Sequence, residues 1–250
     1  MHAIEARNLW FRYEGEWVIR GVSWVVEPSR AVGLIGRSGS GKTTLLRILA
    51  GARRPSRGSV FIMGMDPRKA RGILAYVPQN PSHSFYMPTA LEEVMDSLIG
   101  IKGLSKRDAA TAAMNILNAF GLGEYAGENP FNLSWGEQRR LSLAVVAAYG
   151  PRVILLDEPS TGLSYRDKEW VAALLNGLDS TMVIATHDVD FLLLMGVDEA
   201  VELENGVLEP LSCGRLVSRS EVYMVLRTAE LPEPVRCSSA VPWGDPLRRP

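Results

Sequence analysis

The first part of the chain carries short apolar stretches that are typical of strands. Residues 4–10 and 18–26 mix alternating and continuous apolar positions and are separated by turn-prone residues, so they predict antiparallel strands. Residues 31–35 form a short continuous apolar run, which predicts a buried strand. A glycine-rich loop follows directly, and then an apolar helix over residues 42–50 that Gly51 closes. The pattern therefore predicts a strand, a loop and a helix in immediate succession.

The middle of the chain changes to helical periodicity. A further strand pair is expected around residues 59–64 and 74–77. Capping patterns then open two helices, at Thr89 and at Ser105, and apolar positions in the second are spaced three and four residues apart. Residues 80–150 are therefore expected to form a helical insert.

Strand patterns return in the last third of the chain. Residues 153–156 and 182–185 are apolar runs that end in polar residues, and a helix is expected over residues 166–178 between them. The pair Asn205-Gly206 predicts a closing hairpin. This succession of strands and helices predicts a layered α/β fold.

The composition fits a folded chain with a large core, since 46% of the 250 residues are hydrophobic and 22% are charged. A formal charge of −1 lacks the basic excess that binding to a phosphate backbone needs, so no nucleic acid partner is expected. Cys213 and Cys237 are too few and too far apart to predict a disulfide framework. The sequence has no apolar signal segment and no uninterrupted apolar run of about eighteen residues, so a cytoplasmic protein is expected. The proline-rich tail at residues 229–250 is expected to be extended or disordered.

The loop after residues 31–35 fits the phosphate-binding pattern GxxxxGK[ST] at every fixed position. Glycines let backbone N–H groups turn toward phosphates, and the helix N-terminus adds the positive end of its dipole. Lys42 would place a charge at the β- and γ-phosphates of ATP, and the Thr43 hydroxyl would bind Mg²⁺. A glycine-rich turn with a chance lysine is the alternative. The nucleotide contacts expected in this loop are Gly36, Arg37, Ser38, Gly39, Ser40, Gly41, Lys42, Thr43 and Thr44.

Two acidic residues follow the expected strand at residues 153–156. Asp157 would supply an oxygen ligand for Mg²⁺, through water, because hard cations held by phosphates prefer oxygen. Glu158 is placed to polarise the attacking water as a general base beside the γ-phosphate. Many strands end in solvated charges, so the hypothesis depends on the partnership with the phosphate loop.

Three more segments occur in order with the phosphate loop: Leu-Ser-Trp-Gly-Glu at 133–137, Leu-Asp-Glu-Pro at 156–159 and Thr-His-Asp at 186–188. With them the chain resembles ATP-binding cassette (ABC) ATPases over nearly its whole length. The resemblance implies the P-loop NTPase fold of that family, with a parallel core sheet, an antiparallel β subdomain and a helical subdomain at about residues 80–150. It also implies a catalytic domain over residues 1–228 that binds and hydrolyses ATP with Mg²⁺.

The resemblance implies roles for several side chains. Tyr13 would stack on adenine, although a tyrosine that only packs on its strand is the alternative. Gln79 would touch Mg²⁺ and the attacking water and sense a membrane partner, and His187 would bond the γ-phosphate. A structural histidine is the alternative for His187. Ser134 and Gly136 would face the γ-phosphate bound by a second ATPase subunit, so the site needs two chains.

The implied partners are integral membrane transporter subunits and a second ABC ATPase, with the chain at the cytoplasmic face of the membrane. The segments Gln-Asn-Pro at 79–81, Pro-Thr at 88–89, Glu-Glu-Val at 92–94 and Pro-Phe-Asn-Leu-Ser at 130–134 look most like ATPases of energy-coupling-factor and cobalt-type importers. Those importers take up vitamins or transition-metal ions. A cytosolic ABC ATPase without transport, or a regulatory module that binds ATP, is the alternative.

Three residues depart from the usual family pattern. Trp135 and Glu137 replace a glycine and a glutamine, and Ser164 replaces an aspartate in the loop after Glu158. A tryptophan is unfavourable where positive φ or close approach to phosphate is needed, and a carboxylate near nucleotide adds an unfavourable charge. All three residues fall where two subunits would meet. They favour a heterodimer with a second, different ATPase, and a homodimer that tolerates the changes is the alternative.

Overall fold

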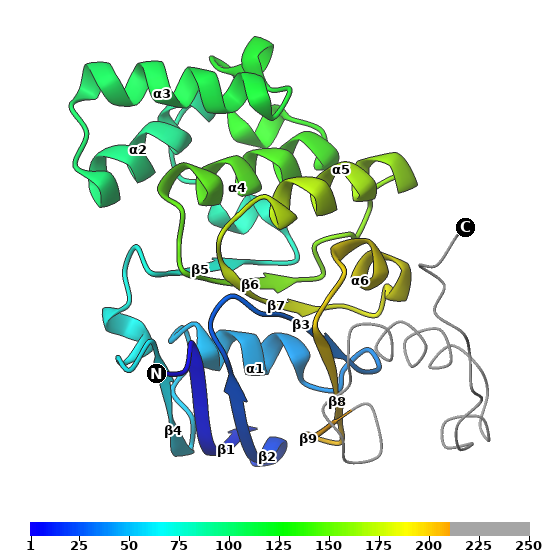
Figure 1. The fold of residues 1–250 in the computed structure, drawn as a ribbon. Helices are drawn as coiled ribbons and strands as arrows, with labels where there is room; N and C mark the ends of the chain where they lie inside the picture. Colours follow the sequence, from blue (N-terminus) through cyan, green and yellow to red (C-terminus); the bar gives the residue numbers. More distant parts are fainter. Residues whose placement is uncertain (211–250) are drawn as a thin grey trace, which may run out of the picture.

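The computed structural model describes residues 1–210, which form two β-sheets with helices packed around them (Figure 1). The expected tail at residues 229–250 lies outside the described residues, as do Cys213 and Cys237. The strands are β1 (Ile4–Tyr13), β2 (Glu16–Val26), β3 (Ala31–Ile35), β4 (Arg57–Ile62), β5 (Leu74–Val77), β6 (Val153–Asp157), β7 (Thr181–Ala185), β8 (Glu199–Glu204) and β9 (Val207–Pro210). The α-helices are α1 (Lys42–Leu49), α2 (Ala90–Lys102), α3 (Lys106–Ala119), α4 (Trp135–Tyr149), α5 (Tyr165–Asn176) and α6 (Val189–Met195). Short 3₁₀ helices span Pro67–Lys69, Pro81–Ser84, Gly123–Tyr125 and Pro130–Asn132.

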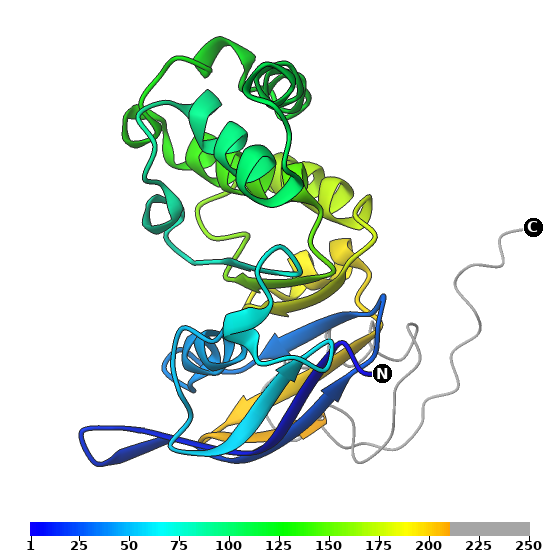
Figure 2. The same cartoon turned by 90° about the vertical axis from the view of Figure 1, so that its left-hand side faces the viewer.

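The six-stranded sheet has the order β5-β6-β7-β3-β8-β9, and all neighbouring strands are parallel except β8 and β9. The smaller sheet is antiparallel, in the order β2-β1-β4. Helices α4, α5 and α6 lie on one face of the six-stranded sheet, with α2 and α3 stacked beyond α4, and α1 lies on the other face, between the two sheets (Figures 1 and 2). Parallel strands end at the same edge of a sheet, so the segments that follow β3, β5, β6 and β7 come together there.

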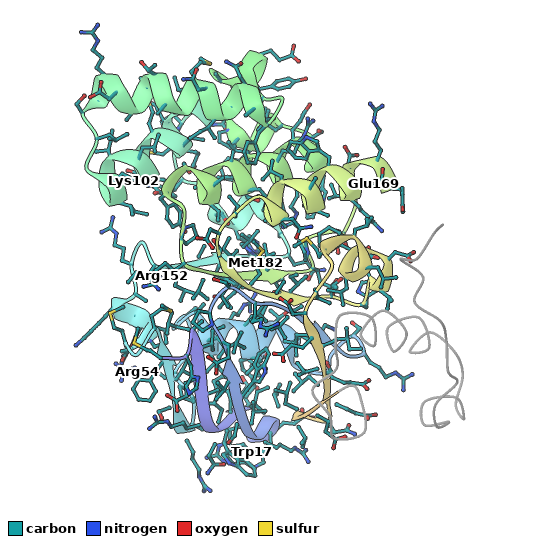
Figure 3. The ribbon with its side chains drawn as sticks, in the orientation of Figure 1. Trp17, Arg54, Lys102, Arg152, Glu169 and Met182 are labelled. Carbon is teal, nitrogen blue, oxygen red and sulfur yellow. The ribbon has the colours of Figure 1, made fainter. Side chains whose placement is uncertain are left out.

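Two hydrophobic cores lie on the two faces of the six-stranded sheet. Successive side chains of a strand point to opposite faces, and β6 follows this rule: Ile154 and Leu156 pack with the helical layer, whereas Val153 and Leu155 pack toward α1 and the small sheet. Side chains fill both layers in Figure 3, where Met182 of β7 lies in the interior. Burial on both faces explains why the core strands are continuous apolar runs in the sequence.

The helices of the middle segment begin where the sequence predicts them. Thr89 accepts a hydrogen bond from the Glu92 N–H at the start of α2, and Ser105 accepts one from the Asp108 N–H at the start of α3. Helix α2 continues beyond the expected end near residue 98 and stops at Gly103, whose φ of 70° closes it. Within residues 1–210 no helix combines the length and the apolar character needed to cross a membrane.

The expected pairing between the strands near residues 59–64 and 74–77 is wrong. β4 pairs with β1 in the small sheet, with Ile62 opposite Ile4, whereas β5 pairs with β6 in the large sheet. The chain between β4 and β5 forms a 3₁₀ helix at Pro67–Lys69, and this connection leads from one sheet to the other. The hairpin expected at Asn205 and Gly206 is confirmed, since β8 and β9 pair around these two residues, both of which have positive φ.

Candidate functional site

The phosphate loop joins β3 to α1 and requires glycine at two points. Gly36 has a φ of 152°, and a Cβ atom there would lie 2.5 Å from the carbonyl oxygen of Leu203. Gly41 has a φ of 105° at the N-cap of α1, and a Cβ atom there would lie 3.1 Å from Val18 Cγ1. Other residues are strained at such φ values and would meet these neighbours. The loop therefore curls at the N-terminus of α1, where backbone N–H groups favour an anion.

A cleft of about 650 Å³ opens beside this loop and gathers residues that are distant in the sequence. Tyr13 reaches it from the end of β1, and Gln79, Glu158 and His187 reach it from the segments after β5, β6 and β7. This convergence follows from the parallel strands, whose carboxyl ends meet at one edge. The residues that line the cleft are Tyr13, Val18, Ser38, Gly39, Gly41, Lys42, Thr43, Thr44, Gln79, Glu158 and His187.

The remaining expected site residues do not line the cleft. Asp157 is buried and hydrogen-bonds the Thr43 hydroxyl, so it lies one residue behind the surface of the cleft. Ser134 and Gly136 begin α4, away from it. The expected residues outside the lining are Gly36, Arg37, Ser40, Asp157, Ser134 and Gly136.

Lys42 brings a cation to the floor of the cleft. Its Nζ donates hydrogen bonds to the carbonyl oxygens of Gly36, at 2.6 Å, and Arg37, at 3.3 Å, and lies 3.9 Å from Glu158 Oε1. Burial lowers the pKa of Lys42, and the nearby charges of Glu158 and Asp157 oppose that shift. A buried ammonium with carbonyl partners on the loop itself suits a group that binds phosphate at the same place.

Asp157 is held by two hydroxyl groups. Its Oδ1 accepts a hydrogen bond from Thr43 Oγ1 and its Oδ2 accepts one from the Tyr76 hydroxyl, both at 3.0 Å. Burial raises the pKa of Asp157, and these two hydrogen bonds work against the rise. Burial and the nearby Asp157 raise the pKa of Tyr76 to about 12, so its hydroxyl stays protonated and donates. The Thr43 and Asp157 oxygens lie side by side and fit a hard cation such as Mg²⁺.

Tyr76 was not among the site residues expected from the sequence. It stands on β5 three residues before Gln79, in a segment whose apolar pattern marks only a strand. Its hydroxyl reaches Asp157 because β5 pairs with β6, with Tyr76 opposite Leu155. Strand order decides this contact, and the pattern of a single strand does not encode it.

Glu158 is oriented toward the cleft by three neighbours. Its Oε1 lies 3.0 Å from His187 Nδ1 and 3.9 Å from Lys42 Nζ, and its Oε2 accepts a hydrogen bond of 2.9 Å from Thr186 Oγ1. The Glu158 backbone has a φ of 47°, a left-handed conformation that is rare outside glycine and common at functional sites. The carboxylate is almost buried, whereas the His187 side chain is 73% exposed. This arrangement fixes a base beside the phosphate loop.

Tyr13 and Gln79 border the cleft on its open side. Tyr13 is the last residue of β1 and is 39% exposed. Its ring packs edge to face against the ring of Phe11, with 4.8 Å between the ring centroids. An exposed aromatic face at a phosphate site can stack on a base. Gln79 is exposed, and its backbone carbonyl accepts a hydrogen bond from Arg139.

The unusual residues near the start of α4 have partners within the same chain. The carboxylate of Glu137 accepts hydrogen bonds from the Ser134 N–H, at 2.8 Å, and the Ser134 hydroxyl, at 2.7 Å, which forms a capping box. These bonds lower the pKa of Glu137. Trp135 is the first helical residue, and its indole N–H donates to the Thr161 carbonyl oxygen at 3.1 Å. The ring lies so close to Gly162 that a Cβ there would be 2.9 Å from it.

Ser164 and Gly136 have simpler surroundings. Ser164 is the N-cap of α5, where its hydroxyl accepts a hydrogen bond of 3.2 Å from the Asp167 N–H. Gly136 has no atom within 4 Å of the place where a Cβ would stand. Each departure from the family pattern therefore has a local structural basis, and the space around Gly136 is open.

The amino-acid sequence matches the ABC transporter family over residues 19–161, more than half of the chain. The energy-coupling factor transporter ATP-binding protein EcfA of Methanosphaera stadtmanae is 31% identical over 230 residues, which cover 88% of this chain and 82% of that protein.

Solved structures agree in fold. CbiO1 from Clostridium perfringens, part of the ABC transporter complex CbiONQ, superposes with a TM-score of 0.74 at 23% identity, over 92% of this chain and 96% of its own. An ATP-binding cassette solved as a dimer in a post-hydrolysis state with ADP and Pi also gives a TM-score of 0.74, at 25% identity, over 83% of this chain and 98% of its own. The chain belongs to the ABC transporter family, as an ATP-binding subunit that hydrolyses ATP.

Proposed function

We propose that this ATPase subunit energises the import of a vitamin or a transition-metal ion through separate membrane subunits. The similarity to EcfA, named as an energy-coupling factor transporter subunit, supports import, and the fold shared with CbiO1 is consistent with it. The segments at residues 79–81 and 130–134 that resemble such ATPases support the same choice. In this proposal the chain sits at the cytoplasmic face of the membrane, and integral membrane partners bind the cargo.

One observation carries the catalytic part of the proposal: the Glu158 carboxylate is fixed at the cleft between His187, Thr186 and Lys42. Glu158 acts as the general base that orients and deprotonates the attacking water. His187 bonds the γ-phosphate, and its exposed ring lies on the cleft side of the carboxylate. Gln79, across the same cleft, contacts the water and the membrane partner.

The phosphate loop and the Asp157 pair hold the nucleotide. The N–H groups at the start of α1 and the Lys42 ammonium bind the phosphates, and Tyr13 stacks on adenine. The Thr43 hydroxyl, Asp157 and Gln79 are the oxygen donors for Mg²⁺, which neutralises phosphate charge when bound.

Ser134 and Gly136 act on the other subunit in this proposal. They lie at the N-terminus of the fifteen-residue helix α4 and do not border this chain's own cleft. The open space at Gly136 allows a phosphate of a partner subunit to approach the helix N-terminus. Each ATP is then enclosed by the phosphate loop of one chain and the α4 N-terminus of the other.

Replacing Glu158 by glutamine separates this proposal from a regulatory module that only binds ATP. The variant E158Q keeps the shape of the side chain and loses the base, so turnover falls about 100-fold or more while ATP binding persists. Uptake of the cargo by cells that depend on this chain falls with it. Glu169→Gln, on the exposed face of α5, is the matched control and leaves both unchanged (Figure 3). Parent-like turnover in E158Q contradicts the proposed base.

A further inference from the structure

Arg139 of α4 is the largest side chain that is fully buried in residues 1–210. Its guanidinium donates hydrogen bonds to three backbone carbonyl oxygens: Pro78 at 2.9 Å, Gln79 at 2.5 Å and Glu158 at 3.5 Å. Among the described residues no carboxylate lies within ion-pair distance of it, and its Nε has no hydrogen-bond partner. Arg139 is therefore a buried cation that only peptide carbonyl groups and more distant charges compensate.

Burying such a cation lowers the free energy of unfolding, so stability alone does not explain its presence. Burial lowers the pKa of Arg139 to about 10, and the charge of Asp157 opposes the shift. Buried charges are often replaceable by apolar side chains of similar volume without loss of stability. A planar fork of donors has one property that an apolar side chain lacks, which is the ability to hold several carbonyl groups in a fixed relation.

The three carbonyl groups belong to the two loops that carry the reacting side chains. Pro78 and Gln79 follow β5, and Glu158 follows β6, the strand beside it. Arg139 itself lies two residues after Glu137, in the first part of the helix that Ser134 caps. One side chain thus connects the Gln79 loop, the Glu158 loop and the helix whose N-terminus serves the second subunit.

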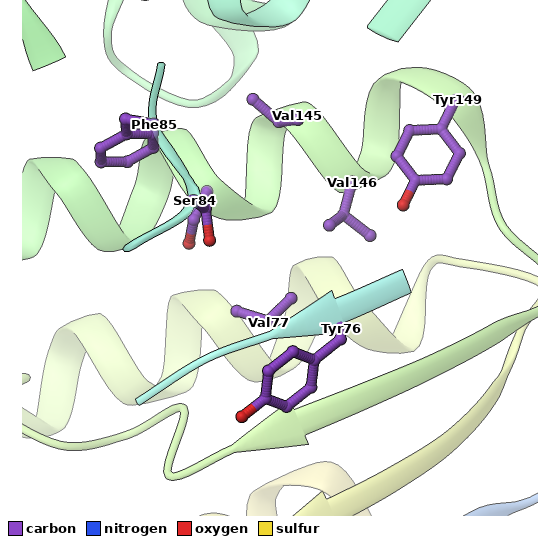
Figure 4. A pocket seen from close by; sticks show the side chains of 8 residues that line it. Tyr76, Val77, Ser84, Phe85, Val145, Val146 and Tyr149 are labelled. Atoms are coloured by element: carbon purple, nitrogen blue, oxygen red, sulfur yellow. The ribbon is translucent and has the colours of Figure 1, made fainter. Parts of the chain in front are cut away.

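Apolar packing between α4 and β5 is interrupted at one place. Helix α4 and β5 face each other across a cavity of about 100 Å³, with Val145, Val146 and Tyr149 on one side and Tyr76 and Val77 on the other (Figure 4). A cavity removes contacts that would otherwise fix the two elements against each other. The hydrogen bonds of Arg139 then form a directional link between α4 and the ends of β5 and β6, in addition to the bond from Trp135 to the Thr161 carbonyl.

We propose that Arg139 is a positioning residue that sets Gln79 and Glu158 in their catalytic relation and ties that relation to the position of α4. The bond to the Glu158 carbonyl, at 3.5 Å, is the longest of the three and the first to be lost or tightened when α4 shifts. Glu158 is also the residue with the left-handed backbone, so its carbonyl direction and its carboxylate direction are linked. This inference rests on the proposed roles of Glu158 and Gln79.

The test compares three variants of the full chain, together with the ATPase and membrane subunits that co-purify with it. Arg139→Met removes the donors, and Arg139→Lys keeps the charge but holds one carbonyl at a time. Leu141→Ala weakens the packing of the same helix and removes no hydrogen-bond donor. All are measured well below their melting temperatures. Arg139→Met lowers kcat on the order of 100-fold, as for small displacements of reacting groups, with KM for ATP near the parent value. The kcat of Arg139→Lys lies between those of Arg139→Met and the parent, and Leu141→Ala keeps the parent kcat.

Hydrogen exchange supplies a readout that is independent of turnover. In Arg139→Met the amides of residues 79, 80 and 82 and of residues 157, 158, 160 and 161 exchange faster than in the parent, and in Leu141→Ala they do not. A parent-like kcat in Arg139→Met overturns the inference. A loss of kcat in Leu141→Ala equal to that in Arg139→Met also overturns it, because Arg139 then has only a structural role. If Arg139→Met does not fold, a parent-like kcat in Arg139→Lys overturns the inference. Turnover in E158Q tests the proposed base separately: when E158Q is inactive and both Arg139 variants are active, only this inference fails.

Discussion

Asp157 is a buried carboxyl to which two hydroxyl groups donate hydrogen bonds. Burial alone raises the pKa of this carboxyl and favours its neutral form, which binds a cation poorly. Thr43 and Tyr76 each donate to one of its two oxygens and favour the charged form. Thr43 belongs to the phosphate loop, so only Tyr76 gives Asp157 a donor that is free of the nucleotide-binding role.

Tyr76→Phe removes that donor and keeps the ring. The half-saturating Mg²⁺ concentration for ATP hydrolysis is expected to rise about tenfold, as for other residues that orient a metal ligand, while kcat at saturating Mg²⁺ changes little. The free energy of unfolding falls by about 1 kcal/mol, the cost of an unpaired buried acceptor. Because the variant raises the pKa of Asp157 further, this loss is absent at low pH, where the carboxyl is protonated, and complete above its folded pKa.

Tyr149→Phe is the matched control for this change. Tyr149 lies on α4, and burial alone raises its pKa to about 12, without a contribution from a charged neighbour such as Asp157. Loss of its hydroxyl leaves the Mg²⁺ dependence as in the parent. An unchanged Mg²⁺ dependence in Tyr76→Phe contradicts the orienting role, and a uniform loss of stability at every pH contradicts the linkage to Asp157.

At the scale of elements, Trp135 joins the start of α4 to the loop after Glu158. The indole N–H bonds the Thr161 carbonyl, and the ring covers Gly162, whose φ is 76°. A helix start and a loop that are separate in the sequence are thus packed as one unit. The bulk that looked unfavourable at this position is accommodated because Trp135 is helical and its ring turns toward its own chain.

A double-mutant cycle measures this contact. Gly162→Ala lowers the free energy of unfolding by about 1 kcal/mol because of the positive φ. It lowers it further because the new Cβ would lie 2.9 Å from the Trp135 ring. In the Trp135→Ala background, Gly162→Ala loses only the backbone contribution. In urea unfolding, the summed losses of the two single variants therefore exceed the loss of the double variant by about 1 kcal/mol. Gly103→Ala, with a φ of 70° and no atom within 4 Å, gives the backbone cost alone. Additive costs contradict the contact.

Local patterns predicted most elements but not how they pair. Continuous apolar runs marked the core strands, and side-chain caps marked α2 and α3, since both signals lie within a few residues of the element. The pairing of β4 with β1 instead of β5 was missed, because pairing between distant strands leaves no local trace. Tyr76 and Arg139 were missed for the same reason. Strand order brings Tyr76 to Asp157, and the packing of α4 on the sheet brings Arg139 to the Glu158 carbonyl.

At the scale of the whole molecule, the proposed pair gives the chain one half of a composite site and has it offer a different half to its partner. The phosphate loop, Asp157 and Glu158 surround its own cleft, whereas the N-terminus of α4 lies elsewhere. That N-terminus carries the charge of Glu137 and the 40% exposed ring of Trp135. A phosphate bound by a second copy would approach the negative charge of Glu137 at this helix N-terminus, which disfavours it relative to the usual glutamine.

This difference predicts an asymmetric pair. The chain alone is expected to hydrolyse ATP on the order of 100-fold more slowly than its mixture with the partner ATPase, because a copy of this chain supplies poorer donors to the γ-phosphate. In the mixture, Lys42→Ala in this chain abolishes most turnover, since it disables the composite site that combines this phosphate loop with the better α4 N-terminus. Trp135→Gly with Glu137→Gln changes the mixture little but accelerates the chain alone. Steady-state turnover with each variant distinguishes the cases: full activity of the chain alone indicates a homodimer, in which every site contains both halves and tolerates them.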